Sequence, residues 1–264
     1  HETIEWAALL HLKSINELKD ITSPSYFELR FSNKCNITCR SCSGHFSHLI
    51  QKENDQIKDE KFQTIVDKVS FGSTGGDELI QWDNIKRVYV GGGESTVQPE
   101  LYRFKHFKNL TFSLSIDGTP KVDEYIRWGT EANDKYSNMQ RLKNQGHPIA
   151  LNFVMSIWNI SHIGEILQYF DTVYPGSPVH MNKAGYNGDI ISPFLFPDKD
   201  VVKESIAKAK KTQVYFSNEQ RTKFLIDSVD KFYSSDKSVD FEKLKKFFYY
   251  NDTLDRVRGV ALKD

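Results

Sequence analysis

"SYFELRFSNKCNITCRSCSGH", residues 25–45, joins a strand-like segment to three closely spaced cysteines. Its first eight residues are rich in aromatic side chains and alternate in polarity, which predicts a β-strand over 25–32. Cys35, Cys39 and Cys42 follow with the spacing Cys-x3-Cys-x2-Cys, and the chain has no other cysteine. Thiolates at this spacing on one loop can converge on one inorganic centre. The stretch therefore predicts a metal or cluster site just after the first strand.

Strand-like and helix-like segments alternate along the rest of the chain. Apolar, β-rich runs predict further strands at 87–90, 110–116, 149–156 and 178–183. Apolar residues at helical spacing predict helices at 59–71 and 159–173, the second with Asn159 or Ser161 as its N-cap. This alternation implies βαβ units and a parallel sheet, so the expected fold class is α/β.

The pattern after residue 198 is helical. Three segments predict helices, at 199–211, 218–233 and 241–250, with a turn at 234–238. We therefore expect an N-terminal extension over 1–24, an α/β domain over 25–198 and a C-terminal helical region over 199–264.

Composition excludes several classes of function. Lys plus Arg and Asp plus Glu both total 35, so zero net charge gives no electrostatic reason to expect nucleic acid as the main partner. No apolar run approaches the roughly 20 residues of a membrane span. The start, "HETIEW", lacks both the layout of a signal peptide and an initiator Met, so we expect a chain that is trimmed, tagged or incomplete. Three clustered cysteines are a poor disulfide framework, and a reducing cytoplasm is the expected location.

Two kinds of centre are compatible with the cysteine spacing. His45 lies three residues after Cys42, so a structural Cys3His zinc site is one possibility. The other is an iron–sulfur cluster, in which three protein thiolates leave one iron open to another ligand. Spacing by itself leaves both open. The histidines elsewhere are expected to be structural or surface residues: His106, His147, His162 and His180.

A glycine run, "GGGEST" at 91–96, follows the predicted strand at 87–90. Glycines let the backbone approach a ligand closely, although many α/β turns contain them. Glu94 would repel a phosphate, whereas its carboxylate suits a ligand that carries an ammonium group.

Together these motifs resemble the radical S-adenosylmethionine superfamily, in its SPASM/twitch-related branch. The family's Gly-Gly-Glu-Pro motif matches Gly92, Gly93 and Glu94, with Ser95 in place of proline. "SLSIDG" (113–118) with "EYIRWG" (124–129) resembles the fourth strand and following loop of the branch. The resemblance implies a partial (β/α)6 TIM-like barrel with a C-terminal helical extension.

The resemblance also implies roles for individual residues. Cys35, Cys39 and Cys42 would hold a [4Fe-4S] cluster, whose open iron binds the amino and carboxylate groups of S-adenosyl-L-methionine. Glu94 would accept a hydrogen bond from the methionine ammonium. The remaining cosubstrate contacts would come from Ser115, Asp117 and Arg127, with Ser115 and Arg127 on the ribose and the carboxylate. Asn152 and Met181 could face the cosubstrate, but we expect them in the core.

The chemistry implied by the resemblance is reductive cleavage of S-adenosylmethionine to a 5′-deoxyadenosyl radical, which abstracts hydrogen from a substrate. A flavodoxin- or ferredoxin-type donor would supply the electron. The substrate expected from this branch is a peptide or protein, and a small metabolite, sugar or nucleotide is the alternative. A non-catalytic zinc-binding module is the alternative from another class. Since no cysteine remains for an auxiliary cluster, we expect one cluster.

The segment between Glu94 and the strand at Leu110 is short for this fold. It holds fifteen residues, "STVQPELYRFKHFKN", where the family has two helices and a whole third strand. A parallel crossover needs a dozen or more residues, and unpaired backbone groups in a buried sheet are costly. We therefore predict that residues are missing from the numbered chain near Phe104–Lys105.

Overall fold

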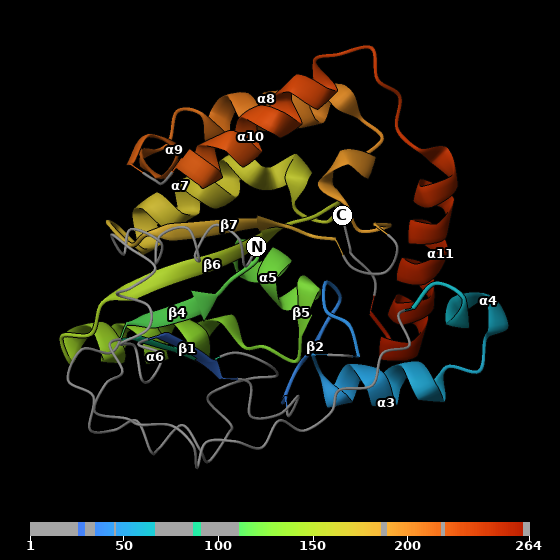
Figure 1. Cartoon of the computed structure of the whole chain (residues 1–264), viewed down its shortest axis with the longest axis horizontal. Coiled ribbons are helices and arrows are strands. Elements are labelled where there is room, and N and C mark those ends of the chain that lie inside the picture. The colour runs from blue at the N-terminus through green and yellow to red at the C-terminus, as the bar shows by residue number, and fades with distance from the viewer. Residues whose placement is uncertain are drawn as a thin grey trace, which may run out of the picture.

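The computed structural model of the chain describes residues 26–29, 35–44, 46–66, 87–90, 111–185, 189–217 and 220–260. Their architecture mixes helices with small parallel sheets (Figure 1). In one sheet, β1 (Tyr26–Leu29) pairs in parallel with β3 (Arg87–Val90). In the other, β4 (Phe112–Ser115), β6 (Ile149–Met155) and β7 (Val179–Lys183) are parallel in the order β4-β6-β7. Each of the five strands that the sequence predicts is confirmed, and so is their parallel pairing.

The three-stranded sheet has two different faces. On one face, residues of β6 and β7 are buried in the core, namely Leu151, Phe153, Met155, Val179 and Met181. The alternate residues Ser115, Asn152 and His180 stand in register on neighbouring strands, and all three keep some exposure. Because side chains alternate across a strand, these polar residues share the opposite face.

Helices make up most of the remaining described structure. Their bounds are α3 (His48–Gln56), α4 (Glu60–Gln63), α5 (Pro120–Ile126), α6 (Ala132–Asn144), α7 (Ile163–Val173), α8 (Lys199–Ala209), α9 (Gln213–Ser217), α10 (Gln220–Tyr233) and α11 (Phe241–Arg258). Two short 3-10 helices are η5 (Ile160–His162) and η6 (Pro193–Leu195). A small antiparallel pair is formed by β2 (Thr38–Cys39) and β5 (Arg127–Trp128). In the described part of the chain, no helix is long and apolar enough to cross a membrane.

Local capping explains where several helices begin. The side chains of Ser47, Asp198 and Asp240 accept backbone N–H bonds in the first turns of α3, α8 and α11. Such bonds satisfy amide groups that have no partner within the helix. Helix α11 ends at Gly259, whose φ of 64° is in the left-handed region that glycine adopts at little cost.

Two hydrophobic clusters hold the described elements together. The first packs α7, α8 and α10 against the buried face of the sheet, through residues such as Phe153, Phe170 and Ile206. Figure 1 shows these helices gathered on the β7 side. The second cluster joins α4, α5 and α11 through Phe62, Ile126, Phe247 and others. The C-terminal helices therefore share both hydrophobic cores with the segments that precede them.

Some local predictions differ from the structure. The helix predicted over 59–71 is α4 (Glu60–Gln63) followed by turns as far as Val66, beyond which the described residues stop. Asn159 lies at the N-cap position of η5, but its side chain does not cap the helix and instead accepts a bond from the N–H of Ser156 (2.8 Å). Helices α3, α5, α6 and α9 and the β2–β5 pair were not predicted from the sequence. The three helices predicted after residue 198 are confirmed as α8, α10 and α11, and so is the turn between α10 and α11.

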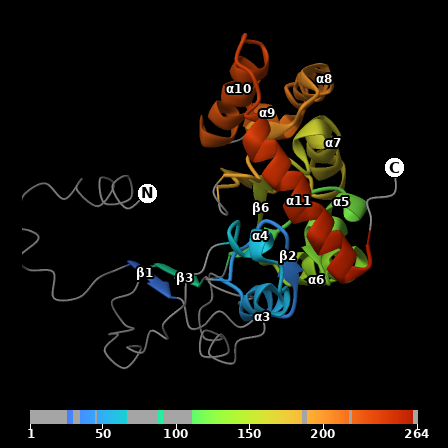
Figure 2. The same cartoon turned by 90° about the vertical axis from the view of Figure 1, so that its right-hand side faces the viewer.

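The partial barrel remains a prediction. Among the described strands, β3 and β4 are not hydrogen-bonded neighbours, and the parallel strands fall into two separate sheets. Figure 2 shows β1 and β3 side by side, apart from β6. Residues 91–110, where we predict that part of the chain is missing near Phe104–Lys105, lie outside the described residues, as do Gly92, Gly93 and Glu94.

Candidate functional site

The cysteine segment pairs with β5, the short strand that directly follows α5. Cys39 lies in β2 directly opposite Arg127 in β5, and Thr38 lies opposite Trp128. Cys39 is buried, whereas Cys35 and Cys42 are partly exposed, and all three are free thiols. The backbone N–H of Cys42 donates to the carbonyl of Cys39 (3.2 Å), which closes a turn between them. This turn makes the spacing of two residues between these cysteines compatible with a shared ligand.

Burial controls the ionisation of two of the thiols. It raises the pKa of Cys39 to about 11 and that of Cys42 to about 12. Negative charge on Cys35 would raise both pKa values further, and Arg127 lowers both. Since Cys35 and Arg127 act on both Cys39 and Cys42, these four side chains lie close enough to interact electrostatically. Without a metal, Cys39 and Cys42 are protonated at neutral pH. Because a metal binds thiolates, metal binding would release protons from these two residues.

His48 also contacts the cysteine segment. Its Nδ1 accepts a hydrogen bond from the backbone N–H of Cys35 (3.1 Å), and it is the first residue of α3. His45, the histidine that the sequence suggested as a zinc ligand, lies outside the described residues. His48 lies three residues after His45, so its position was visible in the sequence, but the Cys3His interpretation did not consider it.

No group of three or more His, Cys, Asp or Glu side chains in the described residues is arranged to hold a metal ion. The assignment of Cys35, Cys39 and Cys42 as ligands therefore stays a prediction. The chemistry of the donor set fits an iron–sulfur cluster, because such clusters are held by cysteine thiolates and this loop carries three free thiols.

Asp117 is a buried carboxylate just beyond the carboxyl end of β4. It is 1% exposed, and its Oδ1 accepts a hydrogen bond from the N–H of Val154 (2.9 Å). Its N–H donates to Asp123 Oδ1 (2.6 Å), and its carbonyl accepts from Asn159 Nδ2 (3.0 Å). Asp117 Oδ2 has no hydrogen bond within the described structure and lies 3.5 Å from Arg127 Nη1. Burial raises the pKa of Asp117, and Arg127 acts against this shift.

A second buried ion pair supports Asp117. Lys135 of α6 pairs with Asp123 Oδ2, and the side chains of both are largely buried. Burial lowers the pKa of Lys135, and Asp123 opposes that shift. Neither residue was predicted from the sequence, because α6 was not anticipated and an isolated lysine carries no local signal of burial.

Ser115 is the last residue of β4 and lies on the polar face of the sheet, in register with Asn152 of β6. Asn152 Oδ1 accepts a hydrogen bond from Asn182 Nδ2 (3.3 Å), which continues the polar row onto β7. Both Asn152 and Met181 were expected in the core. Met181 lies there, whereas Asn152 is partly exposed on the polar face. The structure thus gathers Cys39, Asp117 and Arg127, and places Ser115 two residues before Asp117.

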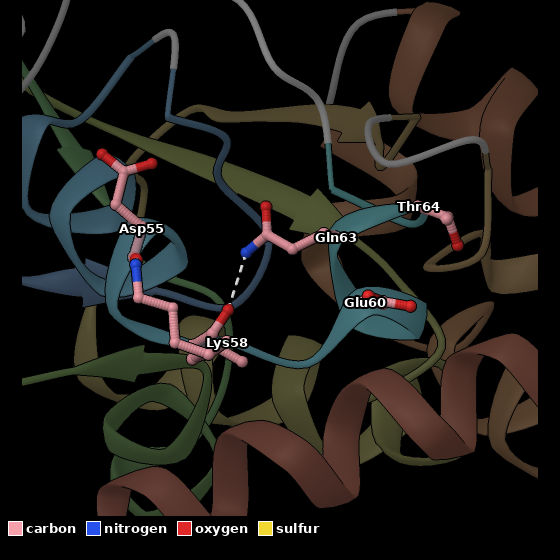
Figure 3. A pocket seen from close by; sticks show the side chains of 6 residues that line it. Asp55, Lys58, Glu60, Gln63 and Thr64 are labelled. Atoms are coloured by element: carbon pink, nitrogen blue, oxygen red, sulfur yellow. Dashed lines mark hydrogen bonds between the residues drawn. The ribbon is translucent and has the colours of Figure 1, made fainter.

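A separate pocket of about 620 Å³ lies between α3 and α4, lined by residues from Asp55 to Thr64. Figure 3 shows the side chain of Gln63 within it. The Nε2 of Gln63 donates to the carbonyl of Ile57 (2.9 Å). None of the predicted site residues lines this pocket. It is therefore distinct from the cysteine site.

No protein-family model and no curated protein matches the sequence. Among solved structures, the chain is similar to hexahistidine-tagged anSMEcpe with bound AdoMet, at 15% identity and a TM-score of 0.42, over 76% of this chain and 60% of that one. It is also similar to native anSMEcpe with bound AdoMet (14%, 0.41), over 91% of this chain and 68% of that one. A third structure, native anSMEcpe with bound AdoMet and Cp18Cys peptide, matches at 15% and 0.41 over the same shares. The chain spans less than two thirds of the first of these proteins, and we base its function on its own residues.

Proposed function

We propose that this chain is a radical S-adenosylmethionine enzyme in which Cys35, Cys39 and Cys42 hold a [4Fe-4S] cluster. The observation that carries the proposal is the pairing of Cys39 with Arg127, together with the approach of Arg127 to Asp117. Two stretches far apart in the chain supplied these residues: the cysteine motif contributes Cys39, and the 113–129 segment contributes Asp117 and Arg127. Their convergence at one place is what a cosubstrate bound to a cluster requires.

Arg127 would bind the cosubstrate's carboxylate. A guanidinium matches a carboxylate in two-point geometry, and Arg127 is 14% exposed beside the thiol of Cys39. Asp117 holds the guanidinium from its buried side and is itself fixed by backbone hydrogen bonds. This arrangement keeps the charge of Arg127 near the thiols without a large loss of side-chain entropy on binding.

Ser115 would contact the ribose from the polar face of the sheet. Parallel sheets are usually covered on both faces, so a partly exposed polar row on one face suits a ligand. This row consists of Ser115, Asn152, His180 and Asn182. We propose that it faces the interior of a partial (β/α)6 barrel, and that Gly92, Gly93 and Glu94, which follow β3 in the chain, approach the methionine ammonium.

When bound, the reduced cluster supplies the electron that cleaves S-adenosylmethionine. This chain's residues would bind and orient the cosubstrate and keep water away from it. We propose a peptide or protein substrate, since a partial barrel is open at one side, and a flavodoxin- or ferredoxin-type electron donor. A small metabolite, sugar or nucleotide is the alternative substrate class.

Metal analysis after anaerobic reconstitution with iron and sulfide tests the proposal first. About four irons per chain with visible absorbance are expected, and one zinc without colour would refute it. Incubation with S-adenosylmethionine and a reductant should then yield 5′-deoxyadenosine without any substrate being known. The chain in which all three cysteines are replaced by alanine is the control, and equal product from it would also refute the proposal.

A further inference from the structure

Arg40 lies inside the cysteine loop, directly after Cys39 and two residues before Cys42. Its side chain is 0% exposed, which is unusual for an arginine. A buried cation is strongly destabilising unless it is paired and its donors are bonded. The contacts of Arg40 therefore show which elements hold this part of the loop in place.

Those contacts go to α5 and α11. The Nε of Arg40 donates to the carbonyl of Tyr125 (2.9 Å), and Nη1 donates to Asn251 Oδ1 (3.1 Å). Nη2 pairs with Asp255 Oδ1 at 2.5 Å. The guanidinium carbon also lies 3.8 Å from the centre of the Tyr125 ring, within cation–π distance.

The backbone of Arg40 is held from the same two helices. Its N–H donates to the carbonyl of Ile126 (2.7 Å), at the end of α5. Its carbonyl accepts a hydrogen bond from the hydroxyl of Tyr250 on α11 (3.2 Å). Side chain and backbone together fix the conformation of the chain between Cys39 and Cys42.

The partners of Arg40 are themselves connected. The hydroxyl of Tyr125 lies 3.1 Å from Asp255 Oδ2 and is also bonded to Asn251. Trp158 Nε1 donates to Asn251 Oδ1 (2.8 Å). Because each partner is fixed by another, the site on α11 that receives Arg40 is preorganised.

A second buried arginine ties α11 to a different element. Arg258 donates from Nε (2.8 Å) and Nη2 (2.6 Å) to the carboxylate of Glu53 on α3, and its side chain is 2% exposed. Figures 1 and 2 show α11 running from the α10 side of the molecule to α3. Two buried arginine–carboxylate pairs therefore involve α11. One joins it to the cysteine loop, and the other joins it to α3.

We propose that Arg40 is a positioning residue, through which the C-terminal helix α11 sets the arrangement of Cys39 and Cys42 for binding one inorganic centre. The role of that centre rests on the proposed function, but the positioning of the thiols does not. Removing the side chain of Arg40 frees the loop from Asn251 and Asp255, whereas removing Arg258 weakens α11 docking and leaves the loop contacts in place.

The test compares Arg40→Met with Arg258→Met in the full chain. Alkylation rates of Cys39 and Cys42 are measured in the metal-free protein by mass spectrometry, with Cys35 as an internal reference, and iron is measured after reconstitution. Arg40→Met should raise the rates at Cys39 and Cys42 at least about tenfold above those of Arg258→Met, as expected for the loss of a charged hydrogen bond. Arg40→Met should also retain less than half the iron that Arg258→Met retains. The comparison is made between fractions of folded protein, so that a difference in unfolding midpoint does not account for it.

Equal alkylation rates in the two variants would overturn the inference, because Arg40 would then contribute only to the docking of α11. If Arg40→Met does not fold, Asp255→Asn is compared with Glu53→Gln, because these variants remove the carboxylate partners of Arg40 and Arg258 and keep the size of each side chain. If the wild-type protein binds zinc and no iron, the proposed function fails. The alkylation comparison still decides the role of Arg40 in that case.

Discussion

Cys39 and Arg127 lie opposite each other in the short antiparallel pair β2–β5. The pairing brings a cation to a thiol whose pKa burial raises, and Arg127 lowers that pKa. Beyond Arg127 lies Asp117, whose Oδ2 is 3.5 Å from the guanidinium. The order thiol, guanidinium, carboxylate gives this part of the molecule a defined charge pattern, and our proposal that Arg127 binds a ligand carboxylate is based on it.

Replacing any one cysteine should abolish cluster chemistry. Cys35→Ala, Cys39→Ala and Cys42→Ala would each leave two thiolates, which do not hold a cluster in this geometry. Iron content and 5′-deoxyadenosine production are the measurements. His45→Ala is the control and should keep its iron. If that control alone lost its metal, the Cys3His zinc site would be favoured.

Glu94→Gln should weaken S-adenosylmethionine binding and leave the iron content unchanged. Loss of a charge-assisted hydrogen bond costs about 1.5–3 kcal/mol, which is roughly a ten- to hundredfold loss of affinity. Titration calorimetry on the reconstituted protein measures it. Glu165→Gln, an exposed carboxylate on α7, is the matched control. Wild-type affinity in Glu94→Gln would show that the match to the glycine-rich motif is misassigned.

Arg127→Ala should lower both stability and cosubstrate affinity, and a second substitution separates the two effects. Without Arg127, the buried Asp117 loses its nearby cation, at a cost of about 1.5–3 kcal/mol. Adding Asp117→Asn removes the uncompensated charge and should restore part of the free energy of unfolding, but not the affinity. Denaturant unfolding and titration calorimetry report the two quantities. Recovery of affinity in the double variant would contradict a direct role of Arg127 in binding.

Gly164→Ala should destabilise the packing of α7 on α8. A Cβ at Gly164 would lie 2.5 Å from the carbonyl oxygen of Ser205 and 2.5 Å from Lys208 Cβ, so the two helices would have to separate. Overpacking of this kind typically costs about 1–3 kcal/mol. Thermal unfolding measures the change. Glu165→Ala, at the next and exposed position of α7, should stay within about 0.5 kcal/mol of the wild type. Equal stability of the two variants would mean that the helices do not cross this closely.

Local sequence patterns predicted the strands well and parts of the helical structure poorly. Alternating and apolar runs identified β4, β6 and β7, because a strand's burial pattern repeats every two residues. Helix α6 was missed because its start, "ANDKYSN", has few apolar residues, and among the side chains described for it Met139 is the one fully buried in the core. Asn159 resembled a helix cap, but the fold uses its side chain to hold Asp117 and Val154.

Local sequence information was sufficient for the spacing of Cys35, Cys39 and Cys42 and for the strand-then-helix order along much of the chain. These are local properties, set by neighbouring residues and by periodicity. The tertiary structure alone decided that Cys39 faces Arg127, that Lys135 and Asp123 support Asp117, and that Arg40 is buried against α11. These contacts join residues far apart in the chain, and they form because a buried charge must find a partner wherever the packing of the cores places one.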